Sequence, residues 1–169
     1  MRVAEVSETG FRESAMAKAL KKLVLEPNID ASRSTYEYLF AAQRQEKQEW
    51  IDNNESDFDV ILSDRGIASH FAYAIAEDLD KQFLDKLFNF GRKPDMIVYL
   101  KVPLYLCMER CLKRGRDRIE ENGVEYFMKV AKNYEDYFKE MRDEKTTLVR
   151  YGSDSSDLIV QIADKCLVK

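Results

Sequence analysis

Cysteine, proline, glycine and histidine are all scarce in this sequence. Its 169 residues include three cysteines, three prolines, six glycines and a single histidine, His70. So few cysteines cannot build the disulfide framework of a small secreted protein, and we expect a reducing, cytoplasmic environment. Cys107 and Cys111 share one face of a predicted helix, but a metal site needs further ligands. We therefore interpret them as buried core thiols.

Long apolar runs and an excess of positive charge are also absent. No stretch approaches the ~18 apolar residues of a membrane span, and the first residues do not resemble a secretory leader. The net charge of −4 argues against a dedicated nucleic-acid binder. With 45% hydrophobic and 34% charged residues, the sequence indicates one globular domain over residues 1–169, with neither a membrane nor a nucleic acid as partner.

Short β-branched runs alternate with amphipathic segments along the chain. Strands are predicted at Arg2–Val6, Val60–Ser63, Met96–Val102 and Thr147–Tyr151. Helices are predicted at about residues 13–24, 34–53, 68–76, 80–90, 104–114, 123–141 and 155–168. This alternation is typical of an α/β fold with a parallel sheet.

The stretch Phe58–Tyr73 (FDVILSDRGIASHFAY) places an acid and an arginine at the end of a predicted strand. Val60–Leu62 is typical of a strand buried on both faces, as in parallel sheets, and Asp64 and Arg65 follow it. Ligands of open α/β sheets bind beyond the carboxyl ends of the strands. The pair is therefore a candidate site, with Gly66 loosening the backbone beside it. A structural ion pair that closes the turn explains the two residues equally well.

A second candidate lies on the long helix that opens with the capping-box pattern Ser34–Glu37 (STYE). Phe40 and Arg44 are one turn apart on the same face of this helix. An aromatic ring and a guanidinium so placed could hold a planar base, one by stacking and the other by hydrogen bonding. On spacing alone, Phe40 also fits the hydrophobic core. The same face carries Tyr36, Leu39, Gln43 and Lys47.

A third candidate is the cationic segment Lys113–Arg118 (KRGRDR). Charge runs of this kind are usually solvated loops. Three of its four cations are arginines, however, and arginine suits bidentate contacts with phosphate oxygens. This favours a mobile lid over about residues 113–122.

Four segments, in order along the chain, carry a family likeness: Leu39–Arg44 (LFAAQR), Ser63–Arg65 (SDR) continuing to Tyr73, Pro94–Pro103 (PDMIVYLKVP) and Arg114–Glu120 (RGRDRIE). Together they resemble the thymidylate kinase family of P-loop nucleoside monophosphate kinases, over roughly residues 1–140. The resemblance implies a three-layer fold with helices on both faces of a parallel sheet. It also implies transfer of a phosphoryl group from ATP to a deoxynucleoside monophosphate, dTMP to dTDP, with Mg²⁺.

The resemblance assigns roles to the candidate residues. Phe40 would stack on the pyrimidine, and Arg44 would reach its carbonyl edge. Arg65 would hold the acceptor monophosphate, with Asp64 supporting it and the magnesium ion through water. The base and sugar would be lined by Ser69, His70 and Tyr73. The lid that closes on the phosphates would carry the further catalytic cations Arg114, Arg116 and Arg118. Such positioning and charge neutralisation are what phosphoryl transfer requires.

The sequence departs from the family pattern in three places. A loop that usually reads Arg-Glu-Pro-Gly-Gly is here Ser7–Gly10 (SETG), which keeps Glu8 as a substrate-binding residue but puts Ser7 in place of the phosphate-reaching arginine. His70 stands where relatives have small or polar residues, which leaves the base preference open. No G-x-x-x-x-G-K-[ST] donor loop occurs in the sequence.

The third departure affects the expected fold as well as the function. Residue 1 corresponds to the start of the family's second strand, so we expect the first strand, the P-loop and the first helix to be missing. That strand would lie between the first two and the last two predicted strands. A deoxynucleoside kinase and a non-catalytic nucleotide-binding or interaction module remain alternatives to a thymidylate kinase. A homodimer is compatible with the sequence, which does not fix the oligomeric state.

Overall fold

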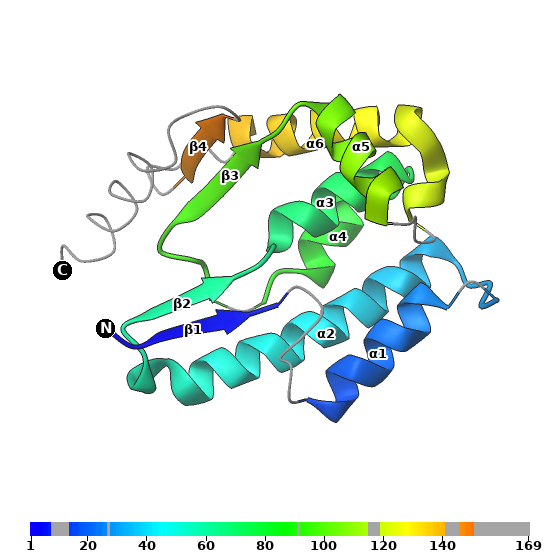
Figure 1. Ribbon diagram of the computed structural model, residues 1–169. Coiled ribbons are helices and arrows are strands. Elements are labelled where there is room, and N and C mark those ends of the chain that lie inside the picture. Colours follow the sequence, from blue (N-terminus) through cyan, green and yellow to red (C-terminus); the bar gives the residue numbers. More distant parts are fainter. Residues whose placement is uncertain (8–13, 27, 91, 115–118, 141–145, 151–169) are drawn as a thin grey trace.

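The computed structural model describes residues 1–7, 14–26, 28–90, 92–114, 119–140 and 146–150 (Figure 1). Its strands are β1 (Val3–Val6), β2 (Val60–Ser63), β3 (Ile97–Lys101) and β4 (Thr146–Arg150). Its helices are α1 (Ala15–Leu25), α2 (Arg33–Asn54), α3 (Ile67–Ala76), α4 (Lys81–Leu87), α5 (Leu104–Arg114) and α6 (Gly123–Glu140), with short 3₁₀ turns at Glu55–Asp57 and Glu120–Asn122. The predicted α/β alternation is confirmed; the predicted last helix lies outside the described residues.

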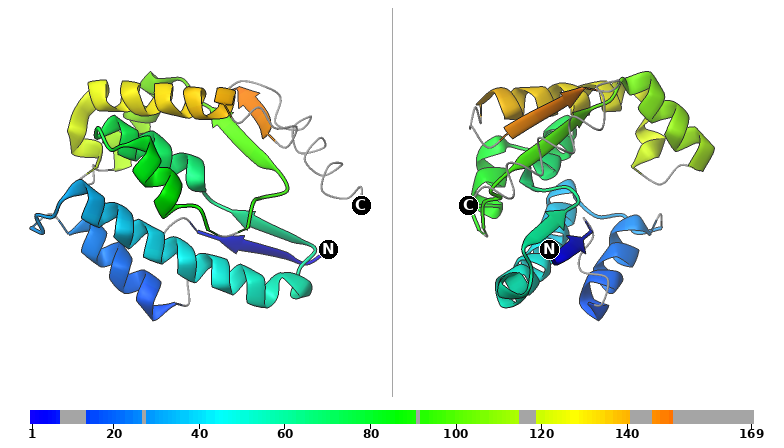
Figure 2. Two further views of the ribbon diagram at one scale, coloured as in Figure 1. Left: turned by 180° about the vertical axis from the view of Figure 1, so that it is seen from behind. Right: turned by 60° about the vertical axis from the view of Figure 1, so that its left-hand side comes forward.

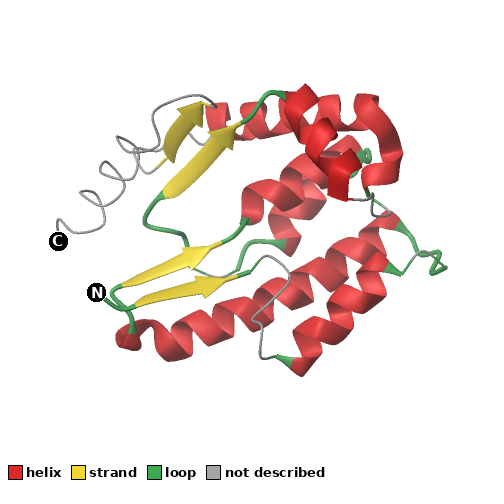
Figure 3. Cartoon of the chain, in the orientation of Figure 1, coloured by secondary structure: helices red, strands yellow, loops and turns green. Residues whose placement is uncertain are grey.

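The strands form two parallel pairs rather than one sheet (Figure 3). In the first pair Val3 lies opposite Val60, and in the second Ile97 lies opposite Thr146. Among the described residues, β2 and β3 each pair on one side only. The expectation that β2 is buried on both faces is wrong, because Val60 and Ile61 are only half-buried and Leu62 is 51% exposed. Leu100 of β3 is likewise 60% exposed.

Side-chain caps begin α1 and α2. The side chain of Ser32, not the predicted Ser34, accepts a hydrogen bond from the backbone N–H of Thr35 at 3.2 Å and begins α2. Ser14 caps α1 in the same way through the backbone N–H of Ala17. α1 lies alongside α2 in every view (Figures 1 and 2). The capping-box prediction is thus wrong, because the helix starts earlier and places Glu37 in its buried face.

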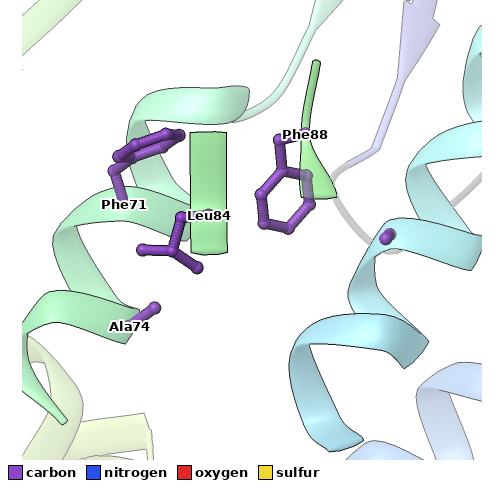
Figure 4. Close-up of a cluster of buried hydrophobic side chains, with 5 residues drawn as sticks. Phe71, Ala74, Leu84 and Phe88 are labelled. Carbon is purple, nitrogen blue, oxygen red and sulfur yellow. The ribbon is translucent and has the colours of Figure 1, made fainter. Parts of the chain in front are cut away.

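A hydrophobic core joins α2, α3 and α4. Phe71 and Ala74 of α3 pack with Leu84 of α4 and with Phe88, the residue that ends it (Figure 4). α6 lies along α3, where the Tyr134 hydroxyl donates to the Ser69 hydroxyl at 2.7 Å. The ring of the same Tyr134 stacks on that of Tyr99, with ring centres 5.6 Å apart, so α6 also contacts β3. The core therefore fixes α3, the helix that follows the candidate strand end.

Among the described residues, neither a metal site nor a membrane-spanning helix forms part of this fold. Cys107 and Cys111 are reduced thiols, and both are half-buried rather than fully buried as predicted. Within the described ranges there is no cluster of three or more His, Cys, Asp or Glu side chains that could hold a metal ion. No helix of the described part of the chain is long and apolar enough to cross a membrane.

Candidate functional site

The turn that follows β2 has a strained backbone. Arg65 has φ 57°, in the left-handed region that costs a residue with a side chain about 1–2 kcal/mol. Gly66 was expected to supply this freedom, but its φ of −153° is extended backbone that any residue adopts. The Ser63 hydroxyl donates to the Arg65 carbonyl at 3.1 Å and helps to hold the turn. The turn was therefore predicted at the correct place, but its unusual backbone conformation belongs to Arg65 and not to Gly66.

Lys47 of α2 also holds this turn. Its ammonium donates to the carbonyl oxygen of Asp64 at 3.2 Å and to that of Arg65 at 3.3 Å. Lys47 belongs to α2 and is only 6% exposed. A buried ammonium is tolerated when it is hydrogen-bonded, and these two carbonyls supply partners. α2 is thereby tied to the carboxyl end of β2.

A small cleft forms where α2, the β2–α3 turn and α3 meet. Its volume is about 10 Å³, and it is lined by Phe40, Arg44, Lys47, Arg65, Gly66, Ser69 and His70. Five of the residues singled out in the sequence therefore come together: Phe40, Arg44, Arg65, Ser69 and His70. Tyr73 lies nearby, with the guanidinium carbon of Arg65 5.5 Å from the centre of its ring. Lys47 completes the cleft, and the sequence reasoning gave it no role.

Three cationic side chains, Arg44, Lys47 and Arg65, line the cleft together with the rings of Phe40 and His70. His70 stacks on Phe88 with ring centres 4.4 Å apart, and Phe40 lies 5.7 Å away. Burial, together with the nearby positive charges of Arg44, Lys47 and Arg65, lowers the pKa of His70 to about 3. The imidazole is therefore neutral at physiological pH. Burial also lowers the pKa of Arg44, whose Nε has no hydrogen-bond partner among the described residues.

Glu37 lies behind His70 and is a neutral acid rather than an ion-pair partner. Its Oε2 is 3.9 Å from Nδ1 of His70, and the residue is 4% exposed. Burial, and then the charge of Glu77, raise the pKa of Glu37 to about 8. Because His70 is neutral over most of the range in which Glu37 is protonated, the contact joins two uncharged groups. The contact between Glu37 and His70 was not predicted from sequence.

The buried pair predicts a bell-shaped dependence of stability on pH. Between pH 4.5 and 8 the folded chain binds more protons at Glu37 than the unfolded chain does, so Glu37 makes stability fall as pH rises. Between pH 3 and 6.5 the folded chain binds fewer protons at His70, so His70 makes stability increase with pH. The two effects oppose each other where they overlap. We expect the free energy of unfolding to fall by about 1–2 kcal/mol from pH 6.5 to 8.

Urea unfolding at a series of pH values checks this expectation. Glu37→Gln should remove the decline above pH 6.5, because glutamine does not titrate. Glu125→Gln, at an exposed position of α6, is the matched control and should retain it. A decline of the same size in Glu37→Gln would show that another group is responsible.

The remaining predicted residues lie elsewhere or outside the described part of the chain. Asp64 is exposed and precedes Arg65 in the turn. Glu8, Arg116 and Arg118 lie outside the described residues, and so does the side chain of Arg114, the last residue of α5. The substrate-binding role of Glu8 and the lid over about residues 113–122 stay predictions.

Comparison with solved structures places this fold in a known class. The chain superimposes on the thymidylate kinase of Candida albicans with a TM-score of 0.76, covering 97% of this chain and 81% of that one at 20% identity. Parallel strands between helices, arranged as in that enzyme, define an α/β protein with the fold of the P-loop kinases.

Comparisons of sequence identify the family. The thymidylate kinase family model matches residues 6–161. A thymidylate kinase of Campylobacter hominis is 33% identical over 131 residues, which are 73% of this chain and 67% of that protein. A probable thymidylate kinase of Thermococcus gammatolerans is 35% identical over 130 residues, 72% of this chain and 62% of the relative. This chain belongs to the thymidylate kinase family, and its matches span about two thirds of these relatives' length.

Proposed function

We propose that the cleft binds a pyrimidine deoxynucleoside monophosphate, dTMP in the first place, as the acceptor of a phosphoryl group from ATP. The observation that carries the proposal is Arg44, which lines the cleft with Phe40 and whose buried Nε has no hydrogen-bond partner among the described residues. An unpaired buried donor is costly, and a carbonyl oxygen of a bound base would satisfy it. Membership of the thymidylate kinase family supports the same substrate class.

Each neighbour of Arg44 has a matching role in this proposal. Phe40 would stack on the base, and the guanidinium of Arg65 would hold the monophosphate at the carboxyl end of β2. Ser69, His70 and Tyr73 would border the base and sugar. The cleft volume of about 10 Å³ leaves room for roughly one water molecule. Binding therefore requires side chains to move, and His70 and Arg44 line the space that must open.

Magnesium would reach the site with the donor nucleotide. Mg²⁺ keeps several waters and is usually held by one or two carboxylates together with substrate phosphates. Asp64 fits that requirement, because its carboxylate is exposed beside Arg65. The ion would neutralise charge on the phosphates, while the arginines of the lid would close over them. A cytoplasmic location, which sparse cysteines favour, belongs to the same proposal.

A nucleotide-binding module without catalysis is the second candidate. It is favoured by one observation, the absence of a G-x-x-x-x-G-K-[ST] segment from these 169 residues. The acceptor cleft and its ligand would be the same in both cases. Binding experiments therefore test the acceptor site, and turnover separates the two candidates.

We expect dTMP and dUMP to bind more tightly than dGMP, by at least about tenfold, which is 1.4 kcal/mol. A pyrimidine needs a smaller opening between the Phe40–Arg44 pair and His70 than a purine does. Isothermal calorimetry with the three nucleotides and with thymidine checks this, and thymidine also tests for a deoxynucleoside kinase. Phe40→Leu should reduce the affinity for dTMP, and Tyr105→Leu, at an exposed aromatic of α5, should not. Tighter binding of dGMP would contradict the assignment of the base pocket.

A further inference from the structure

The position of Lys47 suggests a role that goes beyond packing. It lies on α2 one turn after Arg44 and two turns after Phe40, so the three side chains share one face of the helix. All three line the cleft. The ammonium itself, however, is bonded to the backbone of the turn that carries Arg65.

The two carbonyls that Lys47 binds flank the α-carbon of Arg65. The carbonyl of Asp64 belongs to the peptide unit before that carbon, and the carbonyl of Arg65 belongs to the one after it. The orientations of these two peptide units define φ and ψ of Arg65. By holding both, Lys47 keeps Arg65 at φ 57°, a conformation that a residue with a side chain seldom adopts unless its surroundings impose it.

The backbone conformation of Arg65 also determines where its side chain points. A change from the left-handed to the right-handed or extended region would redirect the Cα–Cβ bond and carry the guanidinium away from the cleft. In the observed conformation the guanidinium carbon is 5.5 Å from the centre of the Tyr73 ring, and Arg65 lines the cleft together with Ser69. The lysine thus sets the direction of the arginine from another helix.

We propose that Lys47 is a positioning residue for the acceptor phosphate, which acts by holding the Asp64–Arg65 turn in the conformation that directs Arg65 into the cleft. The ligand class rests on the proposed function, a nucleoside monophosphate. The conformational part depends only on the contacts of this chain. A direct contact between Lys47 and phosphate is the competing explanation.

The conformational part is tested without ligand. In the complete 169-residue chain, Lys47→Met keeps the aliphatic stem and removes the donors. The ¹³Cα and ¹³Cβ chemical shifts of Arg65 should then move away from left-handed values, while those of the α3 residues from Phe71 onward stay unchanged. Lys132→Met, at an exposed lysine of α6, should leave Arg65 as it is. Unchanged Arg65 shifts in Lys47→Met overturn the proposal, whatever the chain binds.

The functional part is tested with dTMP and thymidine as probes in calorimetry. Lys47→Met should lose at least tenfold in affinity for dTMP and less than twofold for thymidine, whereas a purely structural defect would weaken both alike. Lys47→Arg, which keeps the charge and the donors, should recover most of the loss. If Lys47→Met does not fold, Lys47→Leu, which also lacks donors, undergoes the same measurements with the same expected direction.

The double variant separates positioning from direct contact. In the Arg65→Ala background, Lys47→Met should weaken dTMP binding by less than a further twofold, because the group that it positions is gone. A further tenfold loss there overturns positioning in favour of a direct phosphate contact. If the unmodified chain binds no monophosphate, the proposed function fails, and the Arg65 shifts still decide the role of Lys47.

Discussion

We expect the 169-residue chain by itself to convert dTMP to dTDP only slowly. Ordinary kinases turn over at ~1–100 per second, and the rate of this chain should be lower by at least about 100-fold. The sequence contains no G-x-x-x-x-G-K-[ST] segment, whose backbone N–H groups and lysine cradle the donor phosphates. The cations of the segment Lys113–Arg118 would still attract ATP through their positive charge. Attraction without a cradle does not fix the in-line geometry, and a misplacement of about 1 Å can cost ~100-fold in rate.

The arrangement of the strands supports the same expectation. Among the described residues β2 and β3 pair on one side only, and each exposes a leucine, Leu62 and Leu100. Backbone groups without partners are costly when buried, and open strand edges promote self-association. A further strand between the two pairs would satisfy those edges and would also carry a loop to the carboxyl end of β2.

Two proteins should be compared in an assay of ATP-dependent dTDP formation. One is the 169-residue chain, and the other is the same chain with the strand, glycine-rich loop and first helix of a related thymidylate kinase fused ahead of Met1. The fusion should gain at least about 100-fold in rate, and replacing its loop lysine by alanine should remove the gain. Turnover of the 169 residues at an ordinary rate would refute the idea and would mean that other residues build the donor site.

Local patterns were enough to predict the elements of this fold. The predicted strand Val60–Ser63 agrees with the structure, and the predicted Met96–Val102 exceeds β3 by one residue at each end. Strands and helices are readable because the period of their apolar residues depends only on neighbouring positions. The division into two pairs followed instead from the family resemblance, since no local pattern states which strands are neighbours.

The site was predicted in part, for a similar reason. Helical spacing brought Phe40 and Arg44 together, and the rule that ligands bind at the carboxyl ends of strands selected Arg65. The contacts that were missed are long-range in sequence. Lys47 reaches carbonyls of the β2–α3 turn, and Glu37 lies against His70 of α3.

The sequence contained an indication of each of these contacts, but each indication also had a second, local explanation. Glu37 matched a capping box, so a local explanation concealed its burial. Lys47 lay on the same helix face as Tyr36 and Leu39, and a lysine on an apolar face usually extends to solvent. Only the structure shows that both side chains are buried, and burial is what gives them electrostatic importance.

Arg65→Ala is expected to weaken dTMP binding by about 2–3 kcal/mol, as for a lost pair of charge-assisted hydrogen bonds. That is about 30- to 150-fold in the dissociation constant. Thymidine affinity should change little, because the nucleoside has no phosphate for the guanidinium to hold. Calorimetry with both ligands measures the difference. Arg92→Ala, which removes an exposed arginine paired with Glu55, is the control and should leave both affinities unchanged.

Arg65→Gly separates binding from folding at the same position. Glycine lacks the guanidinium, so it should lose as much dTMP affinity as alanine. Because glycine adopts a positive φ without the steric cost that alanine suffers, the glycine variant should be more stable than the alanine variant by about 1 kcal/mol in urea unfolding. Equal dTMP affinity in the unmodified chain and in either variant would show that Arg65 does not anchor the phosphate. A loss of affinity that followed stability instead, larger in alanine than in glycine, would assign Arg65 to the fold rather than to the ligand.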